Sequence, residues 1–174
     1  MTKYAATATK TERAFGEDEI IVSKTDPTGR ITYANDVFQR VGMYAESELL
    51  GQPHSILRHP DMPRCVFKLL WDTVQRGDEI FAYVKNMAKN GDFYWVFAHV
   101  TPSFDSKHKI IGYHSNRRLP RREAISKIEP IYRQLLGEEE RHADRKVGMV
   151  SAFDMLVGLL KEQAVAYDEF VFSL

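Results

Sequence analysis

The stretch Arg58-His59-Pro60-Asp61-Met62-Pro63 joins charged and ring-bearing side chains in one short segment. Two prolines enclose a carboxylate, and proline fixes φ and lacks a backbone N–H, so neither a regular helix nor a central strand continues through this segment. We therefore expect a structured loop. The apolar run 65–71 follows directly, which places the polar groups of the loop at the mouth of an apolar interior. This arrangement is typical of a site that grips a buried ligand by its polar end.

Upstream of this loop the sequence predicts a β-hairpin. The β-rich runs 20–22 and 31–35 are separated by Asp26-Pro27-Thr28-Gly29, a composition that favours a turn. A short helix over residues 37–41 is expected next, with Asn35 in a position to cap it. Gly42 ends this helix, and a further short one is expected over residues 48–51.

Downstream of the loop the pattern predicts one longer helix and three strands. Apolar residues recur at helical spacing from Arg64 to about Arg76, and Gly77 provides the C-terminal stop. Strands are expected over residues 80–86, 93–100 and 110–115, the first two joined by a turn that contains Asn90-Gly91. Grouped strands of this kind indicate an α+β fold, in which a five-stranded antiparallel sheet carries short helices on one face.

The C-terminal part has a different character. Helices are predicted over residues 123–136 and 147–165, with a charged stretch at 137–146 between them. The second helix carries a wider apolar face than a surface helix needs, and either the body of the protein or a second chain, as in a homodimer, could cover it. We therefore expect three parts: a mobile start with one helical turn (1–18), a sensor domain (19–120) and a helical extension for dimer or partner contacts (121–174).

Composition narrows the function classes. The chain has 174 residues, with 24 Lys and Arg against 24 Asp and Glu, a balance that gives no general attraction to nucleic acid. A single cysteine, Cys65, excludes an internal disulfide and fits a reducing cytoplasm. We find no signal peptide, no apolar run long enough to cross a membrane, no histidine spacing typical of a metal site and no catalytic motif. The sequence thus predicts a cytoplasmic protein that is not an enzyme.

Several separate runs together resemble one known family. They are Ile31-Thr32-Tyr33-Ala34-Asn35, Gly51-Gln52-Pro53-His54, the loop 58–63, Val84-Lys85-Asn86, the run 89–96 and Ile111-Gly112-Tyr113. In this order they resemble the flavin-binding PAS domain of bacterial aerotaxis receptors, over roughly residues 19–120. The short chain is also similar to the free-standing PAS protein of split energy-taxis systems. The resemblance implies a PAS fold, non-covalently bound FAD, a redox-sensing role and a separate membrane chemoreceptor as partner.

The resemblance also implies which residues contact the cofactor. The matching positions are Asn35, Arg58, His59, Asp61, Phe67, Asn86 and Tyr113, and Trp71 would add apolar wall. Arginine offers a planar set of donors for a ring or a phosphate, and asparagine supplies both the donor and the acceptor that the edge of a flavin ring requires. One departure is that Ile80 and Phe81 stand where the receptors carry a tryptophan, so a ring contact is lost or moved.

Other interpretations stand beside these. Asn35 could serve only as a helix cap, and Asn90 is better explained as a turn residue. His59 could bind haem in a gas sensor, since one histidine can hold haem iron, or the domain could be a ligand-free interaction module. Cys65 suggests the light-sensing branch of the family, in which a cysteine forms an adduct with the flavin. The residues next to Cys65 differ from the motif of that branch, so we expect Cys65 to be a small core residue. The arginines 117, 118, 121 and 122 are interpreted as solvated surface or as contacts to an acidic partner or a phosphate.

Overall fold

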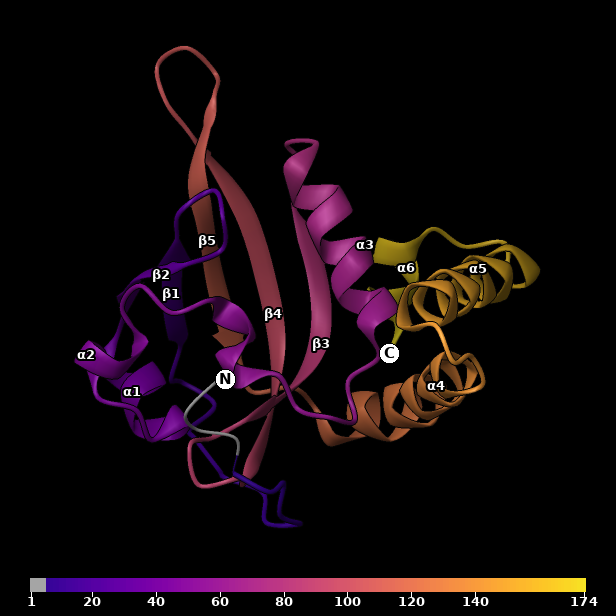
Figure 1. The fold of residues 1–174 in the computed structure, drawn as a ribbon, viewed down its shortest axis with the longest axis horizontal. Coiled ribbons are helices and arrows are strands. Elements are labelled where there is room, and N and C mark those ends of the chain that lie inside the picture. The colour runs from indigo at the N-terminus through magenta and orange to yellow at the C-terminus, as the bar shows by residue number, and fades with distance from the viewer. Residues whose placement is uncertain (1–5) are drawn as a thin grey trace.

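The computed structural model describes residues 6–174 and contains one five-stranded antiparallel sheet (Figure 1). The strands lie in the order β2-β1-β5-β4-β3, so β2 and β3 form the two edges. Their bounds are β1 Ile21–Thr25, β2 Ile31–Ala34, β3 Ile80–Met87, β4 Phe93–Phe104 and β5 Ile110–Arg118. The predicted α+β fold and the five-stranded sheet are confirmed, and the turn between β4 and β5 projects beyond the rest of the sheet (Figure 1).

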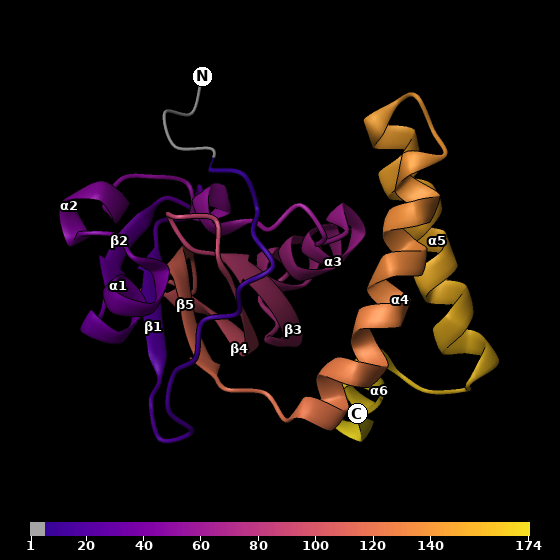
Figure 2. The same ribbon diagram turned by 90° about the horizontal axis from the view of Figure 1, so that it is seen from below.

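Two groups of helices flank this sheet (Figures 1 and 2). The first group is α1 Asp36–Gly42, α2 Glu46–Leu49, the 3-10 helix His54–Leu57 and α3 Arg64–Gln75. The second group is α4 Arg122–Glu140, α5 Arg145–Glu162 and α6 Tyr167–Ser173. Within residues 6–174, no helix combines the length and the apolar character that crossing a membrane requires.

Alternation along the strands divides the sheet into two faces, because successive side chains of a strand point to opposite sides. On β3, Val84 and Asn86 point to the face that carries α3, whereas Tyr83 and Lys85 point to the other face, where α4 lies. Both faces of this edge strand are buried. The strand β3 therefore contacts the interior of the domain on one side and the C-terminal helices on the other.

The C-terminal extension packs on the body of the same chain, most closely through α4 and α6. Ile128, Tyr132 and Leu135 of α4 are buried in one continuous core with residues of the sheet. The hydroxyl of Tyr132 donates a hydrogen bond of 2.7 Å to the backbone oxygen of Tyr83. Helix α5 packs against α4 and α3, and α6 packs against β3. On α5, Ala152 and Leu156 are buried whereas Val147 and Val150 are exposed, so the body covers the apolar face of this helix only in part, and a dimer contact there stays a prediction.

Three local predictions differ from the structure. No helical turn forms in residues 6–18; this segment is extended along the turn before β4, where the backbone N–H of Arg13 donates to the oxygen of Phe93. Residues 1–5, also part of the expected mobile start, lie outside the described residues. The charged stretch 137–146 is helical at both ends, since α4 continues to Glu140 and α5 begins at Arg145. Helix α6 is a separate element that the sequence pattern does not indicate.

Gly112 permits the close approach of β5 to β1. A Cβ atom at this position would lie 2.3 Å from the backbone oxygen of Thr25, well inside van der Waals contact. We expect Gly112→Ala to lower the free energy of unfolding by about 1–3 kcal/mol, because the strands must move apart. Chemical denaturation of the purified variant measures this.

Gly137→Ala is the matched control. Gly137 lies within α4, and a Cβ atom added there would meet nothing within 4 Å. Glycine inside a helix is roughly 0.5–1 kcal/mol worse than alanine, so this variant should be at least as stable as the natural sequence. Equal stabilities for the two variants would contradict the close approach of β5 to β1.

Candidate functional site

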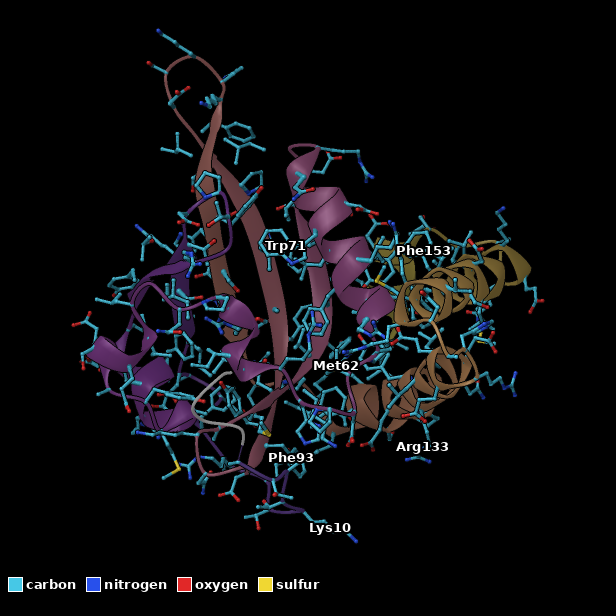
Figure 3. The ribbon with its side chains drawn as sticks, in the orientation of Figure 1. Lys10, Met62, Trp71, Phe93, Arg133 and Phe153 are labelled. Atoms are coloured by element: carbon cyan, nitrogen blue, oxygen red, sulfur yellow. The ribbon has the colours of Figure 1, made fainter. Side chains whose placement is uncertain are left out.

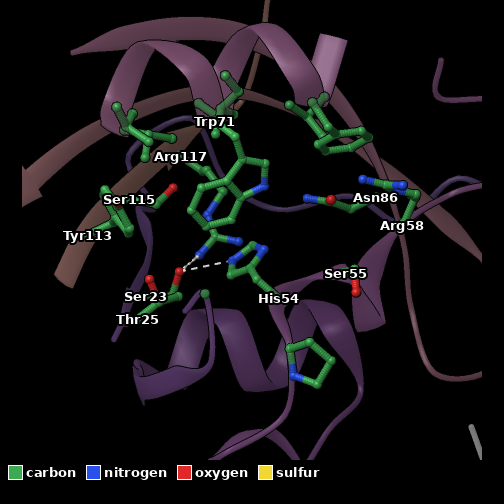
Figure 4. A pocket seen from close by; sticks show the side chains of 18 of the residues that line it. Ser23, Thr25, His54, Ser55, Arg58, Trp71, Asn86, Tyr113, Ser115 and Arg117 are labelled. Atoms are coloured by element: carbon green, nitrogen blue, oxygen red, sulfur yellow. Dashed lines mark hydrogen bonds between the residues drawn. The ribbon is translucent and has the colours of Figure 1, made fainter. Parts of the chain in front are cut away.

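A cavity of about 310 Å³ lies between α3 and the face of the sheet that α3 covers (Figure 4). It is lined by residues from β1, β3, β4, β5, α3 and the segments around Gly29 and His54. These are Ser23, Thr25, Thr28, Gly29, Pro53, His54, Ser55, Arg58, Phe67, Leu70, Trp71, Val74, Val84, Asn86, Ala98, Val100, Tyr113, Ser115 and Arg117. The lining includes five of the eight predicted site residues: Arg58, Phe67, Trp71, Asn86 and Tyr113.

Arg58 and Asn86 lie together because their backbones form an isolated β-bridge. This bridge attaches the loop 58–63 to the edge strand β3. The guanidinium carbon of Arg58 lies 4.1 Å from the ring centre of Phe67, a distance at which cation–π attraction operates. Burial and the neighbouring charge of Arg64 lower the pKa of Arg58. Its Nε is buried and has no hydrogen-bond partner in residues 6–174, so this atom is available to an acceptor.

Trp71 forms the apolar wall on the α3 side (Figures 3 and 4). Its ring meets that of Tyr113 edge to face, with centres 5.3 Å apart and planes at 83°. Gly29 has φ +81°, and a Cβ atom there would lie 2.9 Å from the Trp71 ring. Glycine is thus required at this position for the turn and for the tryptophan. Burial of Tyr113 raises the pKa of its hydroxyl, which stays protonated at neutral pH.

The end of the cavity opposite Trp71 is polar (Figure 4). Nη2 of Arg117 donates a hydrogen bond to Oγ of Ser23, which also lies 3.2 Å from Nε2 of His54. Burial of His54 and the charge of Arg117 lower the pKa of the imidazole to about 3, so the ring is neutral at pH 7. Burial lowers the pKa of Arg117 to about 10, which leaves its guanidinium charged.

Asp61 and His59 lie in the same loop, but neither lines the larger cavity. His59 is buried; its Nδ1 accepts from the backbone N–H of Asp61, and its ring meets Phe93 edge to face. Asp61 accepts a 2.7 Å hydrogen bond from Nζ of Lys85. Although partial burial raises the pKa of Asp61, the bond and charge of Lys85 outweigh this and hold the pKa below its usual value.

Lys85 joins this loop to α4. Its Nζ also lies 3.7 Å from Glu129 of α4 and 4.4 Å from the ring centre of Phe93. Lys85, Asp61 and Glu129 border a smaller cavity of about 200 Å³ between β3 and α4. The side chain of Lys85 is only 9% exposed. It therefore makes a nearly buried link between the loop and the C-terminal extension.

Asn35 has a structural position. Its Oδ1 accepts from the backbone N–H groups of Val22 and Phe38, and its Nδ2 donates to the backbone oxygen of Ile20. Both amide atoms have protein partners and the residue lies outside the cavity lining, and the cofactor contact that the resemblance implied stays a prediction. The alternative interpretation of Asn35 as a helix cap describes what the structure shows.

Cys65 is fully buried, as expected for a core residue. Burial and the nearby carboxylate of Glu139 raise the pKa of its thiol to about 12, so it is protonated and a poor nucleophile. Glu139 of α4 accepts a 2.8 Å hydrogen bond from the backbone N–H of Cys65 and lies 3.4 Å from Nε of Arg64. This second link ties α4 to the first turn of α3, directly after the loop 58–63.

Three polar residues of the cavity lining were not among the predicted site residues: Ser23, His54 and Arg117. The prediction that Arg117 belongs to a solvated arginine cluster is wrong, because its side chain is 2% exposed. Alternation along β5 could have found it: Tyr113, Ser115 and Arg117 are two residues apart and share a face. Arg118, the next residue, is exposed as expected.

These residues suit a flat, acceptor-bearing ligand. The walls supplied by Phe67, Leu70, Trp71 and Val100 are apolar, and Arg58 and Arg117 keep buried donor atoms without partners in residues 6–174. No Asp or Glu occurs among the described residues of the lining. Ligand pockets commonly combine apolar walls with a few convergent polar groups. The donor set therefore fits a flavin, whose ring is planar and whose edge carries oxygen and nitrogen acceptors.

Comparison with known proteins gives the family. A model described as PAS fold matches residues 31–117. The aerotaxis receptor of Escherichia coli (strain K12) is 42% identical over 127 residues, which cover 73% of this chain and 25% of the receptor. The nitrogen fixation regulatory protein of Klebsiella pneumoniae is 28% identical over 99 residues, covering 57% of this chain and 20% of that protein. The chain thus spans a quarter or less of the length of these relatives.

Solved structures agree on the fold. A light-oxygen-voltage domain studied with a flavin analogue superposes with a TM-score of 0.56 at 20% identity, covering 71% of this chain and 87% of that domain. The family model matches half of the chain and runs from the start of β2 to Arg117, near the end of the cavity-lining strand β5. The chain belongs to the PAS family and is similar to the PAS region of the aerotaxis receptor.

Proposed function

We propose that this protein is a cytoplasmic redox sensor for energy taxis, which binds FAD without a covalent bond in the larger cavity. The observation that carries the proposal is the pairing of apolar walls with two arginines, the buried Arg117 and the partly exposed Arg58, each of which keeps a buried donor atom without a partner in residues 6–174. The similarity to an aerotaxis receptor supports it, and a domain of the same fold has been studied with a flavin analogue. When bound, a flavin supplies reversible electron transfer.

The residues proposed to hold the flavin are those that line the cavity. Phe67 and Trp71 contribute apolar wall, Tyr113 supports Trp71, and Asn86 offers a donor and an acceptor to the ring edge. Arg58 takes an acceptor group near the loop. We propose that His59 and Asp61 act indirectly by holding the loop 58–63 in place: Nδ1 of His59 accepts from the backbone N–H of Asp61, and Asp61 bonds Lys85, although Nε2 of His59 is buried without a partner in residues 6–174.

The output is proposed to run through α4, α5 and α6 to a separate membrane chemoreceptor. Lys85 and Glu139 connect the loop and the start of α3 to α4, so a change at the cavity can alter how α4 packs. A ligand shifts such an equilibrium only by its different affinities for the two states. Val147 and Phe172 of the extension are more than half exposed and offer apolar contact area to a partner.

Two asparagines on the same hairpin provide a matched test of the binding site. Asn86 is buried in the cavity lining, whereas Asn90 is exposed in the turn between β3 and β4, where it bonds Asp92. Asn86→Ala should weaken FAD binding by roughly 5- to 150-fold, because a buried polar partner is lost at a cost of about 1–3 kcal/mol. Titration of the ligand-free protein with FAD, followed by fluorescence quenching, measures the dissociation constant.

Asn90→Ala should bind FAD as tightly as the natural sequence does. Equal weakening in both variants would point to a general effect on the hairpin. An unchanged dissociation constant for FAD in Asn86→Ala would show that Asn86 does not contribute to the binding site. If the natural sequence takes up no FAD and purifies without any chromophore, the ligand-free interaction module becomes the better account; a Soret band would favour the haem sensor.

The proposed relay predicts a second result. Lys85→Met should weaken FAD binding less than Asn86→Ala does, because Lys85 lies outside the cavity lining and acts on the site only through the loop 58–63. It removes the contacts to Asp61 and Glu129. Hydrogen–deuterium exchange of α4 should differ between the oxidised and reduced natural protein, since exchange reports local opening. In Lys85→Met this difference should disappear.

Arg76→Met is the control, since Arg76 pairs with Asp78 in an exposed position beyond the end of α3. This variant should keep the difference in α4. A difference that persists in Lys85→Met would show that the signal does not pass through this contact.

A further inference from the structure

Arg117 is a buried cation whose charge the described protein does not balance. Its side chain is among the largest fully enclosed ones in the structure. No carboxylate of residues 6–174 forms an ion pair with it, and no Asp or Glu occurs in the described lining of the cavity. Taking a charge out of water costs several kcal/mol unless a partner compensates. The fold thus carries an electrostatic cost at this position.

The guanidinium is held in a fixed position. Its carbon lies 4.6 Å from the ring centre of Phe38, and Nη2 donates to Oγ of Ser23. Its Nε and Nη1 are buried without a hydrogen-bond partner in residues 6–174. Buried donors are nearly always paired in native proteins, so these two atoms point to a ligand that accepts from them.

The surroundings define the chemistry of that ligand. Ser23 and the neutral His54 adjoin the guanidinium, and Trp71 stands across the cavity (Figure 4). A planar guanidinium with two free N–H groups matches an edge that carries two neighbouring acceptors. A volume of about 310 Å³ is at the lower end of ligand pockets, so a ring system fits inside more readily than a complete dinucleotide.

We propose that Arg117, with Ser23 and His54, binds the acceptor-rich pyrimidine edge of the flavin ring, while Arg58 serves the phosphate-bearing part near the loop. This inference rests on the proposed function. Its consequence is electrostatic: a fixed buried cation beside the ring stabilises negative charge that the ring gains on reduction. Arg117 would therefore make the bound flavin easier to reduce.

Arg117→Met tests this, with Arg118→Met as the matched control, since Arg118 is the next residue and is exposed. We expect Arg117→Met to weaken both FAD and riboflavin by tenfold or more. The midpoint potential of flavin that is still bound at saturating ligand, titrated with dithionite, should become more negative. A tenfold weaker preference for the reduced form corresponds to about 30 mV for a two-electron couple. Arg117→Lys keeps the positive charge but lacks the planar set of donors. Its bound flavin should therefore have a midpoint potential close to that of the natural protein, although its affinity for flavin is reduced.

Riboflavin, which lacks phosphate, locates the contact. If Arg117→Met weakens the binding of FAD but not of riboflavin, Arg117 contacts a phosphate, and the assignment is overturned. Arg58→Met, in contrast, is expected to weaken the binding of FAD alone. Unfolding of the ligand-free protein supplies a separate readout. Arg117→Met should be as stable as the natural sequence or more so, because it removes an unbalanced buried charge.

A large loss of stability with unchanged flavin affinity would show that Arg117 is only structural. If the natural protein binds neither flavin, the proposed function fails and this inference with it. If the natural protein binds FAD and Arg117→Met binds it equally well at an unchanged potential, the inference fails alone.

Discussion

The alternation of side chains along the edge strand β3 connects the cavity to the C-terminal helices. Asn86 points into the ligand-sized cavity, and Lys85, one residue before it, points to the opposite face and contacts the loop 58–63 and α4. A strand places neighbouring residues on opposite faces without any further device. One short segment thus contacts both the candidate binding site and α4. A shift of this strand would therefore alter the contacts on both faces of the sheet.

The cavity combines this geometry with an unusual charge arrangement. Two arginines border it, and no carboxylate occurs among the described residues of its lining. The carboxylates nearby serve other contacts: Asp61 bonds Lys85, and Glu139 accepts from the start of α3. The carboxylates Asp61 and Glu139 therefore belong to the contacts that lead to α4, whereas the charged side chains of the described cavity lining are the two arginines. Such a division suits a protein that binds an acceptor-rich ligand and reads its state through the packing of a helix.

Much of the fold could be predicted from the sequence because the signals are local. The hairpin turn at Asp26, the stop at Gly77 and the Asn90-Gly91 turn each fix a boundary by backbone chemistry. The length of α4 could not be predicted in this way, because Gly137 and a run of charges resemble a linker until packing against α5 is known. Helix α6 depends on tertiary packing, since Phe170 and Val171 become buried only against the rest of the chain.

The site could be predicted only in part for a similar reason. Loop motifs and the family resemblance indicate Arg58 and Asn86 as cavity residues. The hydrogen-bond partners of Asn35, by contrast, are known only from the folded structure. A run of arginines suggests surface, while strand alternation buries Arg117 and exposes the next residue.

Whether the cavity holds FAD can be decided from the absorption spectrum of the freshly purified protein and from that of the ligand released from it by heat. We expect the two absorption bands of a flavin and FAD in the supernatant; a colourless protein that takes up no added FAD would contradict the proposed function.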